Sequence, residues 1–113
     1  MGARATQPTI IPPRAMHKTG TYVGNAVDNR NIDIGVDLAA KSNVYIIIQQ
    51  TTTRGAQHKI EVGQGDLTQM FHTTGDWPDR IQAFTATGFQ LGTSAEVNSD
   101  GDNFRYVVFW EEP

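Results

Sequence analysis

The sequence predicts an all-β fold: an antiparallel β-sandwich, jelly-roll-like, behind an extended proline-rich N-terminal arm. Short β-branched and aromatic runs recur about every 8–12 residues between glycine or Asx residues, as in sandwiches and barrels. Only the segment 36–42 (VDLAAKS) has the composition of a helical turn. With 113 residues and no cysteine, the chain is expected to form one domain, residues 19–113, after an arm of residues 1–18.

The arm, Met1 to Lys18, contains Pro8, Pro12 and Pro13, which exclude a helix or a central strand. Two interpretations stay open, a disordered terminus and an extended arm that orders against a neighbouring protein. Prolines lower the entropy lost on ordering, which suits the second interpretation. The expected arm contacts to a capsid protein are Ile10, Ile11, Pro12, Pro13 and Arg14.

The strands are expected to follow the arm in close succession. In segment 31–36, isoleucine and valine alternate with polar residues or glycine, which is typical of a half-buried strand. Segment 58–62 (HKIEV) places Ile60 and Val62 on one face. The predicted strands cover residues 21–24, 31–36, 43–50, 58–62, 67–72, 80–86, 88–92, 95–97 and 104–110.

Two of these strands are apolar on both faces. Neighbouring strand residues point to opposite faces, yet the runs VYIII (44–48) and YVVFW (106–110) have no polar residue at either parity. The second face requires cover from the arm, a loop or another subunit. A symmetric homo-oligomer is favoured, and a closed barrel covered by loops is the alternative. The residues expected at an oligomer interface or in the core are Tyr45, Ile47, Val107, Phe109 and Trp110.

The segment NSDGDN (98–103) admits two interpretations. Asn98, Asp100 and Asp102 occupy alternate positions, as the oxygen ligands of calcium loops do. Gly101 is fourth where an EF-hand has its glycine sixth, and no glutamate stands at the twelfth position. Asp-Gly between two strand-like runs is a strong hairpin signal. A hairpin tip is therefore favoured, with a calcium ion as the alternative.

Most other chemistries lack the residues they need. The three histidines are not at zinc-ligand spacing, no serine lies in G-x-S-x-G, and GQGD (63–66) lacks the lysine of a phosphate loop. A net charge of -3 gives no drive toward nucleic acid or an anionic membrane. No apolar run approaches the ~20 residues of a membrane span. We therefore expect no enzyme activity, cofactor, nucleic-acid partner or membrane partner.

The loop TTGDWPDR (73–80) is the candidate for glycan contact. Asp76 and Asp79 flank Trp77, and a tryptophan beside acidic groups resembles a sugar platform. The alternative is that Trp77, which precedes a proline, anchors the loop. Catalysis by the two carboxylates would require them to face each other across a cleft.

Two stretches of the chain resemble a small β-domain found in virion proteins of tailed bacteriophages. Residues 19–37 (TGTYVGNAVDNRNIDIGVD) match an opening T-G-x-Y-x-G-N motif, and residues 87–110 match a closing G-F-x-L-G-x-x-x-x-V-N motif. Together they cover roughly half of the chain, and the region 54–80 does not match. The resemblance implies a β-domain in virion structure, as in head decoration, fibre or tail proteins. It supplies no catalytic residues.

A single domain behind an arm suits a small protein present in many copies. The expectation is a non-enzymatic head decoration (cement) protein at the capsid surface of a virion. The resemblance implies a homotrimer, with the arm on the major capsid protein or another virion protein. The alternative is a tail fibre or adhesin module that binds host surface glycan.

Overall fold

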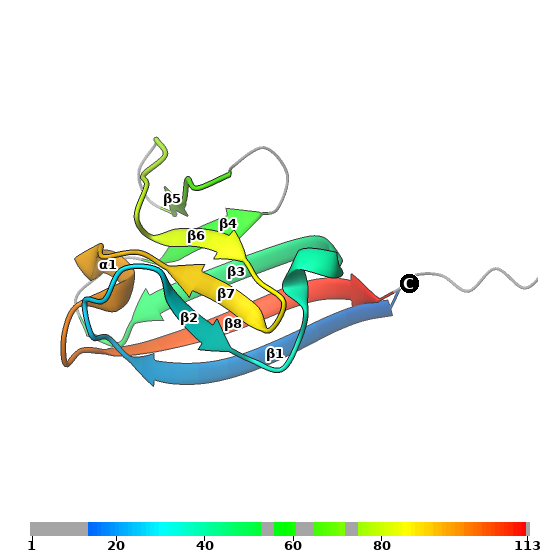
Figure 1. Ribbon diagram of the computed structural model, residues 1–113, viewed down its shortest axis with the longest axis horizontal. Coiled ribbons are helices and arrows are strands. Elements are labelled where there is room, and N and C mark those ends of the chain that lie inside the picture. The colour runs from blue at the N-terminus through cyan, green and yellow to red at the C-terminus, as the bar shows by residue number, and fades with distance from the viewer. Residues whose placement is uncertain (1–13, 53–55, 61–64, 72–74, 113) are drawn as a thin grey trace, which may run out of the picture.

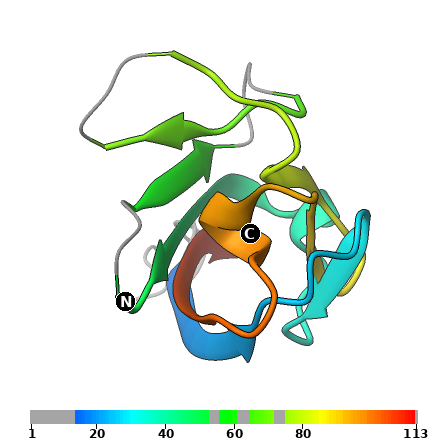
Figure 2. The same ribbon diagram turned by 90° about the vertical axis from the view of Figure 1, so that its left-hand side faces the viewer.

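The protein is an antiparallel β-sandwich, which confirms the predicted fold class. The computed structural model describes residues 14–52, 56–60, 65–71 and 75–112. One sheet has five strands in the order β1-β8-β3-β4-β5, and the other has three in the order β2-β7-β6. The smaller sheet lies in front of the larger one in Figure 1 and to its right in Figure 2.

The strands of the described residues are β1 (Arg14–Val23), β2 (Arg30–Asp33), β3 (Ser42–Gln50), β4 (Gln57–Ile60), β5 (Gln69–Met70), β6 (Ile81–Phe84), β7 (Gly88–Leu91) and β8 (Asn103–Glu112). Two short helices accompany them, η2 (Leu38–Ala40) and α1 (Ala95–Asn98). The single turn η2 lies inside the segment for which a helical turn was considered, and Asp37 caps it with a side-chain oxygen.

The core lies between the two sheets. Every second residue of β3 and β8 points into it, which is why both strands are rich in β-branched and aromatic residues. The fully or nearly buried apolar side chains are Ile32, Ile34, Leu38, Val44, Ile46, Ile48, Ile81, Phe89, Leu91, Val97, Phe104, Val108 and Trp110. The smaller sheet therefore covers one face of the larger sheet and leaves the opposite face without a second layer of described residues.

The start of the sheet differs from the prediction. Strand β1 begins at Arg14 and pairs with β8 along its whole length, from Arg14 opposite Glu112 to Val23 opposite Asn103. Residues 14–18 of the predicted arm therefore belong to the sheet. The arm residues Ile10, Ile11, Pro12 and Pro13 lie outside the described residues.

The predicted strand at 95–97 is wrong, because these residues form helix α1. The Ser94 hydroxyl accepts a hydrogen bond from the Glu96 N–H and so caps the helix, while Val97 is buried. A strand pattern of three residues could not compete with this local cap. The turn at 98–103 therefore joins a helix to β8 and is not the tip of a hairpin.

The turn itself is a β-turn of type II. The Asp102 N–H donates to the Ser99 carbonyl oxygen at 3.2 Å, and Gly101 has φ +81°. Only Gly101 in this turn has a positive φ, whereas the type I′ turn typical of an Asp-Gly hairpin needs two such residues. The Ser99 hydroxyl donates to the Asp102 carboxylate, so one of the calcium candidates already has a partner.

The side-chain amide of Asn98 joins the two sheets at one end of the sandwich. Asn98 is fully buried, with 0% of its surface exposed. Its Nδ2 donates to the carbonyl oxygens of Val27 at 2.9 Å and Gly92 at 3.0 Å. Its Oδ1 accepts from the Asn25 N–H at 3.0 Å and from Arg30 Nη1 at 3.1 Å. The amide thereby makes all four hydrogen bonds that its two donors and two lone pairs allow.

Other contacts join the segments 19–37 and 87–110. The Tyr22 hydroxyl donates to the Val97 carbonyl oxygen at 2.6 Å, and its ring stacks on Phe104 with centroids 5.2 Å apart. Burial raises the pKa of Tyr22, which keeps the hydroxyl protonated and able to donate. A Cβ on Gly24 would come within 2.0 Å of the Ser99 carbonyl oxygen. Residues of the segments 19–37 and 87–110 thus meet in space and have structural roles.

Replacing Asn98 by aspartate tests this joint. The substitution keeps the shape but removes both donors, leaves the carbonyls of Val27 and Gly92 unpaired, and places a carboxylate beside them. We expect a loss of about 3 kcal/mol or more in the free energy of unfolding, measured by urea denaturation. The control is Asn103→Asp, because Asn103 is exposed. Equal, small losses in both variants would contradict the role of Asn98.

Candidate interaction surface

The face of the five-stranded sheet that points away from the smaller sheet is the candidate site, and we call it the outer face. The strand register arranges the side chains at its centre in three rows across the sheet. The first row is His17, Phe109, Tyr45 and Ile60; the second is Thr19, Val107, Ile47, His58 and Gln69; the third is Thr21, Arg105 and Gln49. The first row is largely apolar, and Val107 and Ile47 are the apolar residues of the second row.

The outer face leaves large apolar side chains open to solvent. Phe109 is 43% exposed and Ile60 is 42% exposed, while Tyr45, Ile47 and Val107 are half-buried by their neighbours in the sheet. Scattered exposed apolar residues are ordinary, but a contiguous set across three strands is typical of an interaction surface. Of the five predicted interface or core residues, four lie here, whereas Trp110 points into the core and is 5% exposed.

A shallow hollow lies on this face beside the exposed ring of Phe109. It has a volume of about 380 Å³. Its lining residues are Thr19, Gly20, Thr21, Ile47, Gln49, Arg105, Tyr106 and Val107. The hollow arises because threonine, valine and glycine present small side chains where the sheet is otherwise covered by rings. Its shape suits an apolar side chain that protrudes from another surface.

An aromatic cluster extends the outer face toward β5. The His58 ring stacks on Tyr45 with centroids 5.7 Å apart and lies 4.5 Å from the Phe71 ring. Burial lowers the pKa of His58, because the charged imidazolium would lose its hydration between two rings. His58 Nδ1 is buried without a hydrogen-bond partner among the described residues. The neutral ring is therefore the form that fits this cluster.

The candidate glycan loop is anchored to the fold through its tryptophan. Trp77 pairs with Thr68 through two backbone hydrogen bonds of 2.9 Å, and the Arg80 guanidinium lies 4.6 Å from its ring centroid. One face of the ring is thus occupied by Arg80, as expected of a loop anchor. Asp76 and Asp79 are exposed, and Asp79 adopts φ +62°. Nothing in the described residues brings the two carboxylates together across a cleft.

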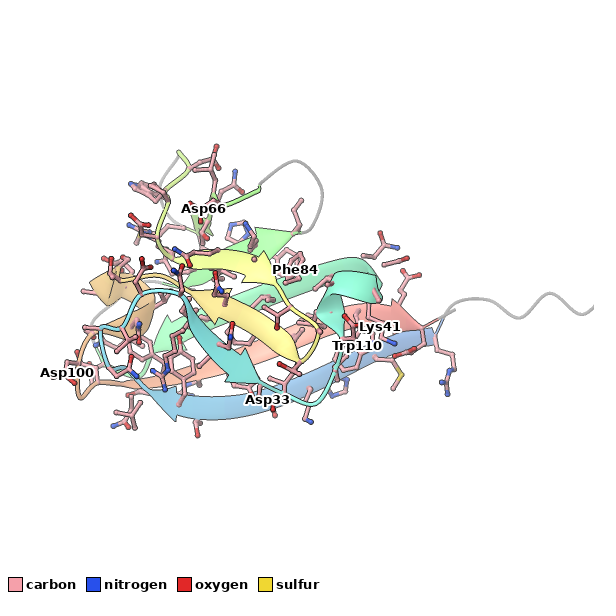
Figure 3. The ribbon with its side chains drawn as sticks, viewed as in Figure 1. Asp33, Lys41, Asp66, Phe84, Asp100 and Trp110 are labelled. Atoms are coloured by element: carbon pink, nitrogen blue, oxygen red, sulfur yellow. The ribbon has the colours of Figure 1, made fainter. Side chains whose placement is uncertain are left out.

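Two of the three calcium candidates already have hydrogen-bond partners within the protein. The Asn98 amide is buried and fully used, and the Asp102 carboxylate accepts from Ser99. Asp100 lies at the tip of the turn, at the end of the molecule opposite Lys41 and Trp110 (Figure 3). Among the residues that the structure describes, no three His, Cys, Asp or Glu side chains gather in a way that could hold a metal ion.

The structure also contains buried polar residues that the sequence analysis did not anticipate. In β4 the residues Gln57 and Lys59 face the core and Ile60 faces out, while Val62, expected on the same face as Ile60, lies outside the described residues. Lys59 is 2% exposed, and its ammonium donates to the carbonyl oxygens of Gly65 and Leu67, the latter at 2.8 Å. Burial lowers the pKa of Lys59, and nearby Asp66 partly opposes this shift.

Arg80 continues this polar group between the sheets. Its guanidinium donates to the Gln57 side-chain oxygen while stacking on Trp77. Gln57 and Arg80 show no alternation with apolar neighbours, so periodicity gave no signal for their burial. Gln57 and Arg80 are 23 residues apart in the sequence, and only the folded chain brings them together.

In the described part of the chain, no helix has the length and apolar character needed to cross a bilayer. No family model matches the chain, and neither a curated protein nor a solved structure is significantly similar to it.

His58 predicts a pH dependence of stability. Its folded pKa lies below the unfolded value of about 6.5, so the unfolded chain takes up the proton first as the pH falls. Stability is therefore complete above about pH 6.5 and declines as the pH falls through the folded pKa. Urea denaturation between about pH 7 and 5 measures the slope. His58→Phe keeps the ring stack and should flatten this slope; an unchanged slope would refute the assignment.

Proposed function

We propose that this protein is a non-enzymatic structural protein of a phage virion, a decoration protein that reinforces the capsid surface. The observation that carries the proposal is the outer face, where two central strands expose apolar residues that their own domain does not cover. A surface of this kind is an aggregation liability unless another protein covers it. Its burial against a neighbour stabilises an assembly by roughly 25 cal/mol for each Å² of apolar area removed from water, before the costs of association.

The geometry of β1 supports a second contact through the arm. The chain enters the sheet at Arg14, directly opposite Glu112 near the end of β8. The residues that precede Arg14 are therefore connected to β1, which pairs with β8 along its whole length. Thirteen residues precede Arg14, and an extended chain of that length spans about 43 Å at ~3.3 Å per residue. That reach is sufficient for the arm to contact a neighbouring capsid protein while the outer face binds elsewhere.

The proposal predicts that the protein is abundant in intact particles. Quantitative mass spectrometry of purified virions should find copies in numbers comparable to those of the major capsid protein, because reinforcement needs repeated sites. Immunogold labelling should place these copies on the head. A copy number as low as that of tail proteins, or labelling confined to the tail, would overturn the decoration role.

A truncation tests the arm separately. Deleting residues 1–13 leaves all of β1 in place, so the domain should keep its circular dichroism spectrum and its unfolding midpoint. Binding to undecorated capsids should fall at least about tenfold, since the apolar contacts of the arm are lost. The matched control replaces only Ile10 and Ile11 by serine. Undiminished binding of the truncated protein would contradict the role of the arm.

A further inference from the structure

The outward residues of β8 form a pattern that is complementary to itself. In order along the strand they are Arg105, Val107, Phe109 and Glu111, with a basic end, two apolar residues and an acidic end. Arg105 is exposed and has no partner among the described residues. Glu111 is half-buried and accepts a hydrogen bond from the Asn43 side chain at 3.0 Å. When a second strand with this pattern is reversed, its acidic end lies opposite the basic end of the first strand, and its basic end lies opposite the acidic end.

We propose that a second copy of this chain covers the outer face, with a two-fold axis that crosses β8 at the level of Val108. The axis lies between the facing five-stranded sheets of the two copies and runs perpendicular to their strands, so the two β8 strands run antiparallel. Arg105 then lies against Glu111 of the partner subunit, and Val107 lies against Phe109 of the partner subunit. Each contact occurs twice, which is the property of a two-fold interface.

The other side chains of the outer face are consistent with the same two-fold rotation. The axis falls between the first and second rows of the outer face, so each row lies over the other row of the second copy. Tyr45 then lies over Ile47 of the partner subunit, and Ile60 lies over His58 of the partner subunit. Apolar residues thus face apolar residues across β8 and β3, and Ile60 faces an imidazole ring across β4. Two sheets packed face to face in this way can keep the small angle between their strand directions that the twist of each sheet produces.

Phe109 and the hollow are the parts that interlock. Phe109 is the exposed large apolar side chain of β8, and the hollow beside Val107, Ile47 and Thr19 is about 380 Å³ in volume. Since the axis places Phe109 of one subunit over Val107 of the other, each ring lies at the hollow of its partner. The face supplies both the protruding group and the cavity, so one surface is sufficient for the contact.

The charge pattern identifies a second copy as the occupant. A partner of one sign would meet a repulsive group at one end of β8, whereas a reversed copy satisfies both ends at once. This inference rests on the proposed function only in treating the outer face as an assembly surface. It differs from the trimer that the phage resemblance implies.

A charge exchange between two variants tests the pairing in the full-length chain. Arg105→Glu and Glu111→Arg, each alone, place like charges at both ends of the interface and should weaken self-association at least about tenfold. A mixture of the two variants brings opposite charges together at both ends. The mixture should therefore form a dimer nearly as tight as the wild-type dimer, and the double variant should do the same. Sedimentation equilibrium and native mass spectrometry measure these affinities.

Further variants separate the interface from general effects. Phe109→Asp should abolish the dimer, whereas Val27→Glu, at an exposed apolar residue of the β1–β2 loop, should leave it intact. Circular dichroism must show that each variant is folded. A wild-type protein that stays monomeric, a trimer, or a mixture that associates no better than its components would overturn the pairing. None of these results changes the copy number in virions, so failure of the pairing and failure of the decoration role remain distinguishable.

Discussion

The arrangement of the two sheets depends on one buried amide, that of Asn98. Strands β1 and β8 are neighbours in the larger sheet, and β2 and β7 are neighbours in the smaller one. The amide binds the backbone of the β1–β2 loop and that of Gly92, which follows β7, while its own chain continues into β8. All four strands are therefore fixed at one end by groups that water cannot replace. An unpaired donor or acceptor at this depth would be costly, which gives the joint its specificity.

This joint also determines which surface is left for other proteins. Once β2 and β7 are held over one face of β1, β8 and β3, the alternation of those strands directs the remaining apolar residues outward. Tyr45, Ile47, Val107 and Phe109 are accordingly displayed on a sheet whose opposite face is rigid core. An interface built on a packed sheet loses little conformational freedom when it forms, because its side chains are already held by their neighbours.

Sequence reasoning succeeded where one pattern was long and strong. The double-sided apolar runs of β3 and β8 indicated both a core face and a second face in need of cover, and the structure places their residues accordingly. It failed where a polar side chain is buried by specific hydrogen bonds to groups outside its own strand or turn. Lys59 points inward because the carbonyl groups of Gly65 and Leu67 receive its ammonium. Asn98 was expected at a hairpin tip, with a calcium ion as the alternative, whereas its amide is bound by Asn25 and Val27, more than sixty residues earlier, and by Gly92. No local period encodes such contacts.

The pairing of β1 with β8 has a mechanical consequence. When the chain ahead of Arg14 is pulled along β1 while the outer face is held, the load acts parallel to a ten-residue ladder, from Arg14 opposite Glu112 to Val23 opposite Asn103. The hydrogen bonds of that ladder share the load and must yield together. A pull that separates Arg14 from Glu112 sideways would instead open the ladder one pair at a time. The direction from which a neighbour holds the arm therefore determines whether the domain behaves as a strong link or a weak one.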